Sequence, residues 1–247
     1  MDVVWLGLWG SLAAGLASGL GASPAFIIKS ISPKLMDALL GFSAGIMLAA
    51  TSFSLVLPSI NLGGLWISSL GIILGGIFMA AANWLTPHIH SISSRQGPPF
   101  RLSRVWLFVL AITLHNFPEG MSVGVGFGTG DMKEGVALAM GIGFQNMPEG
   151  LAVAFALIRE GYSPFRGFAY ATLTGLVEPI GGLLGVGIVT LAHILLPWGL
   201  AFAGGAMLFV ISNEIIPETH RGGHPSQATF GVLLGFVVMI LFDNLFA

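Results

Sequence analysis

The sequence predicts an all-α integral membrane protein, built as a bundle of eight transmembrane helices. Of its 247 residues, 55% are hydrophobic and only 8% are charged, whereas a soluble domain carries about 25% charged residues. Such a chain cannot cover a water-exposed surface. Its apolar runs are continuous rather than alternating, which favours helices over a β-barrel. The 36 glycines suit the close approach of neighbouring membrane helices.

Charge and cysteine content narrow the class further. The net charge of −2 gives no case for nucleic acid as a partner. The chain contains no cysteine, which excludes disulfides, thiolate metal sites and thiol redox centres. It starts Met1-Asp2, without the basic segment of a cleaved signal peptide, so we expect the first apolar run to be retained as a helix. We expect residues 1–247 to form a single transmembrane domain.

Eight apolar runs of membrane-spanning length follow one another along the chain. A helix needs about 20 residues to cross a bilayer, and each run reaches this length within the error of its boundaries. The runs cover approximately residues 4–28, 35–57, 63–86, 104–128, 135–158, 165–190, 197–217 and 228–246.

The basic residues predict how these spans are oriented. With the N-terminus outside, eight of the nine Lys and Arg residues fall on connections that face the cytoplasm, which is the positive-inside pattern. Only Lys133 falls on the outer side. Both termini are therefore expected outside. The residues on the inner side are Lys29, Lys34, Arg95, Arg101, Arg104, Arg159, Arg166 and Arg221.

The longest connection, residues 87–103, contains Gly and Pro and is expected to be a cytoplasmic loop. It carries His88 and His90. Two interpretations of this pair stay open: ordinary solvated loop residues, or a metal-handling segment on the exit path.

Two related hexapeptides lie inside the fourth and fifth runs. Residues 115–120 read His-Asn-Phe-Pro-Glu-Gly, and residues 145–150 read Gln-Asn-Met-Pro-Glu-Gly. A carboxylate at the centre of a bilayer costs about 3 kcal/mol if Glu behaves like Asp, so two of them need a reason. Positions i, i+3 and i+4 of a helix share a face. Each span therefore presents an imidazole or amide, a second amide and a carboxylate together.

The prolines and a third carboxylate extend this polar group. Pro118 and Pro148 cannot donate backbone hydrogen bonds, so they free carbonyl groups one turn earlier and favour a kink. The sixth run adds Glu178, also followed by a proline, and the second run adds Met47. Buried carboxylates repel one another unless they are protonated or bind cations.

The chemistry of these side chains indicates a metal. Imidazole, carboxylate and amide oxygen suit Zn²⁺, Fe²⁺, Mn²⁺ or Cd²⁺, and the absence of cysteine argues against copper(I). Other interpretations stay open for single members of the set. Asn116 and Asn146 could be helix–helix hydrogen-bond partners, and Met47 could be core filler.

At these residues the chain resembles the ZIP (Zrt-/Irt-like) family of divalent metal transporters, and it is most similar to the prokaryotic zinc-transporting branch. The resemblance covers the whole chain, and the doubled Asn-x-Pro-Glu-Gly is its most specific part. It implies a binuclear metal centre in which Glu119 and Glu149 bridge. The first metal would be held by Met47, His115, Glu119, Gln145 and Glu149, and the second by Asn116, Glu119, Asn146, Glu149 and Glu178.

Three further positions follow from the resemblance. Asn213 and Glu214 match a His-Glu pair near the inner exit, but Asn in place of His puts a metal role for Asn213 in doubt. Asp243 is either a further acidic site or a solvated end residue. Some members carry Asp where this chain has Asn146; three Glu alone leave a two-metal centre with a net charge of +1, so we expect the second metal to bind more weakly.

The expected function is transport of divalent cations, zinc first, across the cell membrane toward the cytoplasm. No nucleotide-binding loop is present, so we expect transport without ATP hydrolysis. The resemblance to the family implies alternating access, with spans 1, 4, 5 and 6 sliding against spans 2, 3, 7 and 8. The glycines of spans 4 and 6 fit a sliding interface and static packing equally. The expected partners are metal ions and lipid, with a homodimer left open. A metal-selective channel and an intramembrane metalloenzyme are the alternatives, although no His-Glu-x-x-His occurs.

Overall fold

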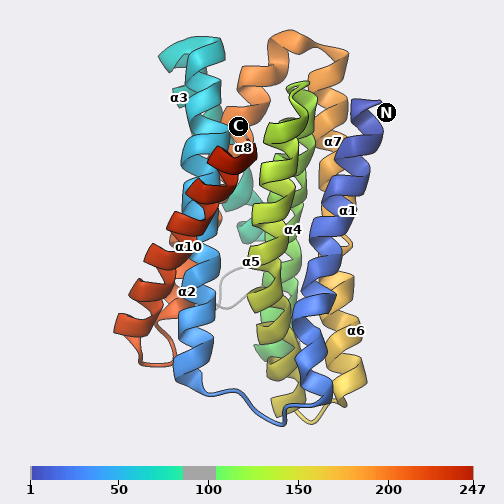
Figure 1. Ribbon diagram of the computed structural model, residues 1–247, viewed down its shortest axis with the longest axis vertical. Coiled ribbons are helices and arrows are strands. Elements are labelled where there is room, and N and C mark those ends of the chain that lie inside the picture. The colour runs from blue at the N-terminus through green and yellow to red at the C-terminus, as the bar shows by residue number, and fades with distance from the viewer. Residues whose placement is uncertain (1, 86–103, 247) are drawn as a thin grey trace.

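The computed structural model describes residues 2–85 and 104–246 and is helical, without a strand in these ranges. His88, His90 and the rest of the expected loop lie outside the described residues. Both ends of the described chain lie at the same end of the bundle (Figure 1). We refer to it as the terminal end, and to the other as the opposite end.

The helices follow one another with few irregular residues between them (Figure 1). In chain order they are α1 (Val3–Ala22), η1 (Ser23–Phe26), α2 (Pro33–Ala49), η2 (Ala50–Val56), α3 (Leu57–Leu85), α4 (Arg104–Gly128), α5 (Met132–Arg159), α6 (Pro164–Gly175), α7 (Glu178–Leu191), η3 (His193–Leu195), α8 (Leu196–Val210), η4 (Ile211–Ile215), α9 (Ile216–Thr219) and α10 (Pro225–Phe246). Here η1 and η3 are 3₁₀ turns, and η2 and η4 are π-helical segments.

Five segments of the described chain are long and apolar enough to cross a membrane. They are Val3–Phe26, Pro33–Leu85, Pro164–Leu191, His193–Thr219 and Pro225–Leu245. α4 and α5 are long enough but are not among the five. These two helices carry both hexapeptides, whose His, Asn, Gln and Glu side chains lower their hydropathy.

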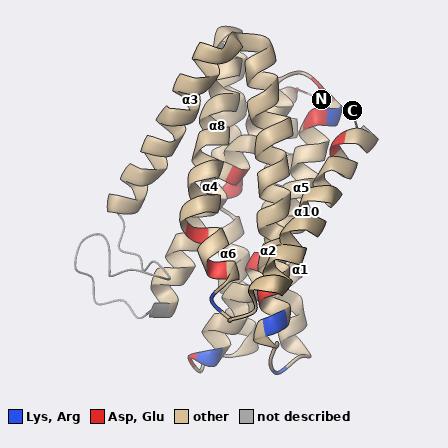
Figure 2. Cartoon of the chain, turned by 90° about the vertical axis from the view of Figure 1, so that its left-hand side faces the viewer, with Lys and Arg blue, Asp and Glu red and all other residues tan. Residues whose placement is uncertain are grey.

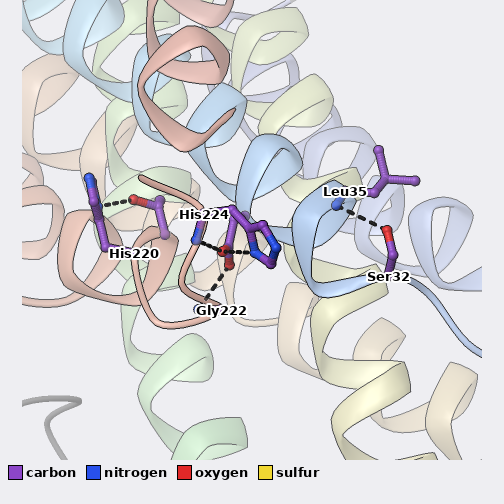
Figure 3. Close-up of polar contacts among 7 residues, drawn as sticks. Ser32, Leu35, His220, Gly222 and His224 are labelled. Carbon is purple, nitrogen blue, oxygen red and sulfur yellow. Dashed lines mark hydrogen bonds and ion pairs between the residues drawn. The ribbon is translucent and has the colours of Figure 1, made fainter. Parts of the chain in front are cut away.

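Local capping explains where several helices begin. The Ser32 hydroxyl accepts a hydrogen bond from the backbone N–H of Leu35, and Pro33 occupies the first turn (Figure 3). Asp131 caps α5 in the same way through the N–H of Lys133, and Ser163 caps α6. A side-chain oxygen at this position satisfies a backbone donor that the helix cannot, and proline lacks that donor.

The long helix α3 is divided by a turn at Gly64, whose φ of 76° is open to glycine at low cost. The Ser59 and Ser68 hydroxyls lie 2.7 Å apart, whereas nine residues of straight helix would extend about 13.5 Å. The chain therefore folds back at Gly64. α2, η2 and the start of α3 form one limb, and residues 65–85 form the return limb.

Contacts between helices divide the bundle into two groups. α1 packs against α4, α5, α6 and α7, and we name these five helices the first helix group. α2 packs against α10, α3 packs against α8, and η2 touches both pairs. η4 and α9 pack against α2, and together these elements form the second helix group. The groups meet mainly where α5 touches α2 and α10, and where α4 touches α8.

At the opposite end, a buried carboxylate ties parts of the second helix group together. Asp37 accepts hydrogen bonds from the backbone N–H groups of Gly222, at 3.2 Å, and His224, at 3.1 Å (Figure 3). A Cβ at Gly222 would lie 2.4 Å from the Asp37 carboxylate. Only glycine allows this approach, which fixes the start of α2 to the turn between α9 and α10.

Candidate metal centre

The eight residues expected to bind metal are all buried. Their exposed fractions are 0% for Met47, Glu119, Gln145, Asn146 and Glu178, 1% for Asn116 and Glu149, and 2% for His115. They come from α2, α4, α5 and α7. In Figure 2, acidic segments lie in the middle of the bundle as well as at its ends.

Both hexapeptides lie inside continuous helices, with Pro118 within α4 and Pro148 within α5. The predicted spacing therefore holds, and His115 and Glu119 share one face of α4, as Gln145 and Glu149 share one face of α5. The two patches meet, because Gln145 Nε2 donates a hydrogen bond of 2.7 Å to Glu119 Oε1.

Glu178 enters the centre from a helix start that the sequence did not predict. The expected span of residues 165–190 is broken after Gly175, and α7 begins at Glu178 with Pro179 in its first turn. An acidic side chain is favoured at this position by the helix dipole and by the free N–H groups. Asn146 Nδ2 donates to Glu178 Oε1 at 2.5 Å and to the Ala14 carbonyl at 2.9 Å.

In the side-chain amides of Gln145 and Asn146, the NH₂ group is hydrogen-bonded and the carbonyl oxygen is not. Each NH₂ group donates to a carboxylate of a neighbouring helix, which orients that carboxylate. Each carbonyl oxygen is buried and has no hydrogen-bond partner. The same side chain can thus position one ligand and act as another.

Unpaired polar atoms concentrate at this centre. In the described chain, nine buried side-chain nitrogen and oxygen atoms have no hydrogen-bond partner, and eight of them belong to residues expected to bind metal. The ninth is Thr51 Oγ1. The eight are His115 Nδ1, both amide atoms of Asn116, Glu119 Oε2, Gln145 Oε1, Asn146 Oδ1, Glu149 Oε2 and Glu178 Oε2.

The His, Asp and Glu side chains of the described residues do not form a metal site without other ligands. No group of three or more His, Asp or Glu side chains in the described residues is arranged to hold a metal ion. The expected ligand set therefore depends on its amide oxygens and on Met47. Met47 lies in the buried apolar cluster that includes Ile46 and Met207.

Glu214, expected on the exit path, lies beside the imidazole of the centre. Its Oε2 is 2.5 Å from His115 Nε2, and its Oε1 accepts a hydrogen bond of 2.6 Å from Asn83 Nδ2. Glu214 lies in the π-helical segment η4, and such segments are frequent at functional sites. The sequence reasoning missed Asn83, whose signal was an amide inside an apolar run.

Sequence reasoning also missed Ser43. Its hydroxyl donates to Glu149 Oε1 at 2.6 Å and lies 3.2 Å from the backbone carbonyl oxygen of Gln145. Ser43 precedes Met47 by four residues on α2, so it occupies the same helix face. That spacing was the only available signal, because serine is common in membrane helices.

A cavity lies beyond the centre at each end of the bundle. The cavity at the opposite end measures about 520 Å³, and its wall includes Leu40 of α2, Ala152 of α5 and Glu218 of α9. The cavity at the terminal end measures about 390 Å³. There, Asp243 accepts hydrogen bonds of 2.9 and 3.1 Å from Ser54, so it is held by a partner rather than being a freely solvated end residue.

Comparison with known proteins gives one consistent group of relatives. The sequence profile of the ZIP Zinc transporter family matches residues 85–243. Zinc transporter GufA of Myxococcus xanthus is 46% identical over 96% of this chain and 97% of that protein. Zinc transporter ZIPB of Bordetella bronchiseptica is 45% identical over 95% of this chain and 79% of that protein. Zinc transporter ZupT of Chlorobium phaeovibrioides is 35% identical over 94% of each chain.

Proposed function

The chain belongs to the ZIP zinc transporter family, and on that premise we propose that it carries zinc through the buried polar centre of α2, α4, α5 and α7. It is a multi-pass protein of the cell membrane and transports zinc; it is not an enzyme. The residues of the centre, its movement and its selectivity are the parts proposed here.

The observation that carries the proposal is the set of unpaired buried atoms at the centre. A buried polar atom without a partner costs about 1–3 kcal/mol, and eight such atoms gather on seven side chains. Most of them are oxygen acceptors, and His115 adds an imidazole nitrogen. A bound divalent cation would satisfy these acceptors, which explains why they lie together without hydrogen-bond partners.

We assign two adjacent metal positions to this centre. Met47, His115, Glu119, Gln145 and Glu149 form the first. Asn116, Glu119, Asn146, Glu149 and Glu178 form the second, with Glu119 and Glu149 shared. Each of the three Glu residues has one oxygen held by a hydrogen bond and the other unpaired. Two divalent ions on three carboxylates leave a charge of +1, so the second ion binds more weakly.

The fold supports eight crossings with both termini outside. Gly64 divides the long segment Pro33–Leu85 into two crossings, and α4 and α5 add two more that are enriched in site residues. Both termini lie at one end of the bundle (Figure 1). Most Lys and Arg gather at the other end (Figure 2), which is the cytoplasmic end by the positive-inside rule.

Alternating access between the two helix groups would expose this centre to each side in turn. Hydrogen bonds between the groups occur at the centre itself: Ser43 with Glu149, and Glu214 with His115. The 520 Å³ cavity begins one helical turn beyond this contact, because Leu40 and Ala152 lie three residues from Ser43 and Glu149. We therefore place the inner exit there, beside Glu218, which lies four residues after Glu214. His88 and His90 remain expected contributors.

Two further parts of the proposal concern which metal ions compete with zinc and whether the protein forms a dimer. Imidazole, carboxylate and amide ligands also accept Cd²⁺, Fe²⁺ and Mn²⁺, so we propose that these ions compete with zinc. A homodimer in the lipid bilayer is the proposed assembly. Competition for zinc uptake in sealed vesicles tests the first point, and the mass of the purified protein in detergent tests the second.

Zinc uptake by proteoliposomes tests the centre. We expect saturable uptake that His115→Ala and Glu149→Ala each reduce at least 100-fold, since each change removes a ligand. Asp2→Asn is the control, because Asp2 is an exposed carboxylate at the start of α1 that lines neither cavity, and Asn keeps the cap of that helix. Uptake that stays linear to high zinc would instead favour a channel. Unchanged uptake by Glu149→Ala would exclude the proposed centre.

A further inference from the structure

Ser43 is fully buried on α2 and touches the metal centre from the second helix group. It has no place in either proposed ligand set. Its hydroxyl has two acceptors within reach: Glu149 Oε1, 2.6 Å away, and the backbone carbonyl oxygen of Gln145, farther off at 3.2 Å. A hydroxyl that donates to a carboxylate makes a short, charge-assisted hydrogen bond. Ser43 therefore acts on Glu149 rather than on the backbone.

The three carboxylates of the centre share one pattern. In each, Oε1 accepts a hydrogen bond and Oε2 has no partner. The donors to Glu119 and Glu178 are Gln145 and Asn146, which belong to the centre and to the first helix group. Glu149 differs, because its donor comes from the other helix group.

We propose that Ser43 is a positioning residue for zinc binding: it holds Glu149 Oε1 so that Oε2 faces the metal. The proposal rests on the metal centre proposed above. Hydrogen-bond partners of metal ligands orient the ligand, and their removal usually weakens metal affinity 10- to 100-fold. Here the effect is concentrated on Glu149, which is shared by both metal positions.

The location of Ser43 also makes this positioning dependent on conformation. Ser43 moves with α2 and Glu149 moves with α5, so their hydrogen bond lasts only while the two helix groups keep the relative position of this structure. A slide of one group past the other removes the donor from Glu149. The affinity for zinc then falls at the moment when the centre changes the side to which it opens.

Zinc affinity of the purified full chain in detergent tests the proposal, measured by competition with a zinc-binding dye. We expect Ser43→Ala to weaken binding about tenfold and Ser43→Thr, which keeps the hydroxyl, to restore it. Ser11→Ala is the matched control. Ser11 is also a fully buried serine, but its hydroxyl donates to Gly7 O within its own helix, so its removal should leave the affinity unchanged.

Several results would contradict the proposed role of Ser43. A structural role for Ser43 would lower the unfolding temperature of the metal-free protein and leave the dissociation constant for zinc unchanged, which contradicts the proposal. Tighter binding by Ser43→Ala would also contradict it, as would a Thr variant as weak as the Ala variant. Ser43→Gly serves as a second hydroxyl-free variant if Ser43→Ala does not fold. If wild type binds no zinc, or Glu149→Ala binds it normally, the metal centre itself is wrong.

Discussion

Within each helix group, several glycines bring two helices together backbone to backbone, whereas glycines at the contact between the two groups meet side chains. A Cβ at Gly120 would lie 2.0 Å from the carbonyl oxygen of Glu178, and one at Gly124 would lie 2.1 Å from that of Gly182, both inside the first group. In the second group, a Cβ at Gly75 would lie 2.0 Å from the Phe202 carbonyl oxygen, and Gly205 is equally close to Ile72.

Between the groups, two glycines meet side-chain atoms instead. A Cβ at Gly141 of α5 would lie 2.3 Å from Met239 Sδ of α10, and one at Gly199 of α8 would lie 2.9 Å from Val189 Cγ1 of α7. The buried apolar cluster that joins the groups is rich in methionine, with Met47, Met121, Met207 and Met239. Methionine adapts to changed surroundings because it is unbranched and polarizable.

This difference bears on the proposed movement between the groups. Backbone contacts at glycine leave little room for displacement, so we expect each group to move as a unit. Side-chain contacts between the groups can be remade after a slide. Gly120 and Gly124 of α4 and Gly181 and Gly185 of α7 therefore belong to close packing within the first group. The proposed sliding interface is lined by side chains such as Met239 and Val189.

The largest effect is expected from a cross-link between the groups. Because the chain has no cysteine, the double variant Gly141→Cys with Met239→Cys introduces a single pair across the interface. Oxidation should abolish zinc transport, and a reductant should restore it, as measured by uptake in proteoliposomes. The control pair is Ser59→Cys with Ser68→Cys, whose hydroxyls lie 2.7 Å apart within the second group. Full transport by the cross-linked Gly141–Met239 pair would show that the groups do not move apart.

A smaller effect is expected when the same methyl group is added to each kind of interface. Gly120→Ala forces a Cβ against the backbone of Glu178, and overpacking of this kind costs about 3 kcal/mol. Gly141→Ala meets only the end of Met239, which can turn away, so we expect about 1 kcal/mol or less. Thermal unfolding in detergent measures both. Equal losses would remove the distinction between the two interfaces.

The smallest effect concerns a metal position that lies inside one group. All proposed ligands of the second metal come from the first helix group, whereas Met47 brings the second group to the first metal. Asn146→Asp adds a negative charge and removes the NH₂ donor to Glu178. We expect about tenfold tighter binding of the second ion, or 1.4 kcal/mol, and a less stable metal-free protein. Calorimetric zinc titration that shows no gain would contradict the charge argument.

The residues of the site could be predicted from the sequence more completely than the breaks and turns of the helices that carry them. His115, Glu119 and Glu149 stand out because charged or imidazole groups are costly in apolar runs, and helical spacing places them on shared faces. Their burial agrees with that reasoning. The division of the spans into two groups also follows the expected pairing of spans 1, 4, 5 and 6 against the others.

Other features depend on contacts between distant residues and leave little trace in the sequence. The pairing of His115 with Glu214 joins positions 99 residues apart, and Ser43 is one of many serines in apolar runs. The break before Glu178 was hidden because Gly, Leu and Val around it are as apolar as the helices on either side. The expected runs place the connection between the second and third spans at residues 58–62, but the chain turns at Gly64, inside the expected third run, and the turn needs one residue rather than a loop.

The two π-helical segments, η2 and η4, both lie in the second group, one after Met47 and the other around Glu214. A π turn contains one residue more than an α turn. Deleting a single residue from η4 would restore regular α-helix there and change which side chain of this segment faces His115. The orientation of the Glu214 side chain toward His115 therefore depends on the number of residues in this helical turn, and not on the chemistry of any side chain.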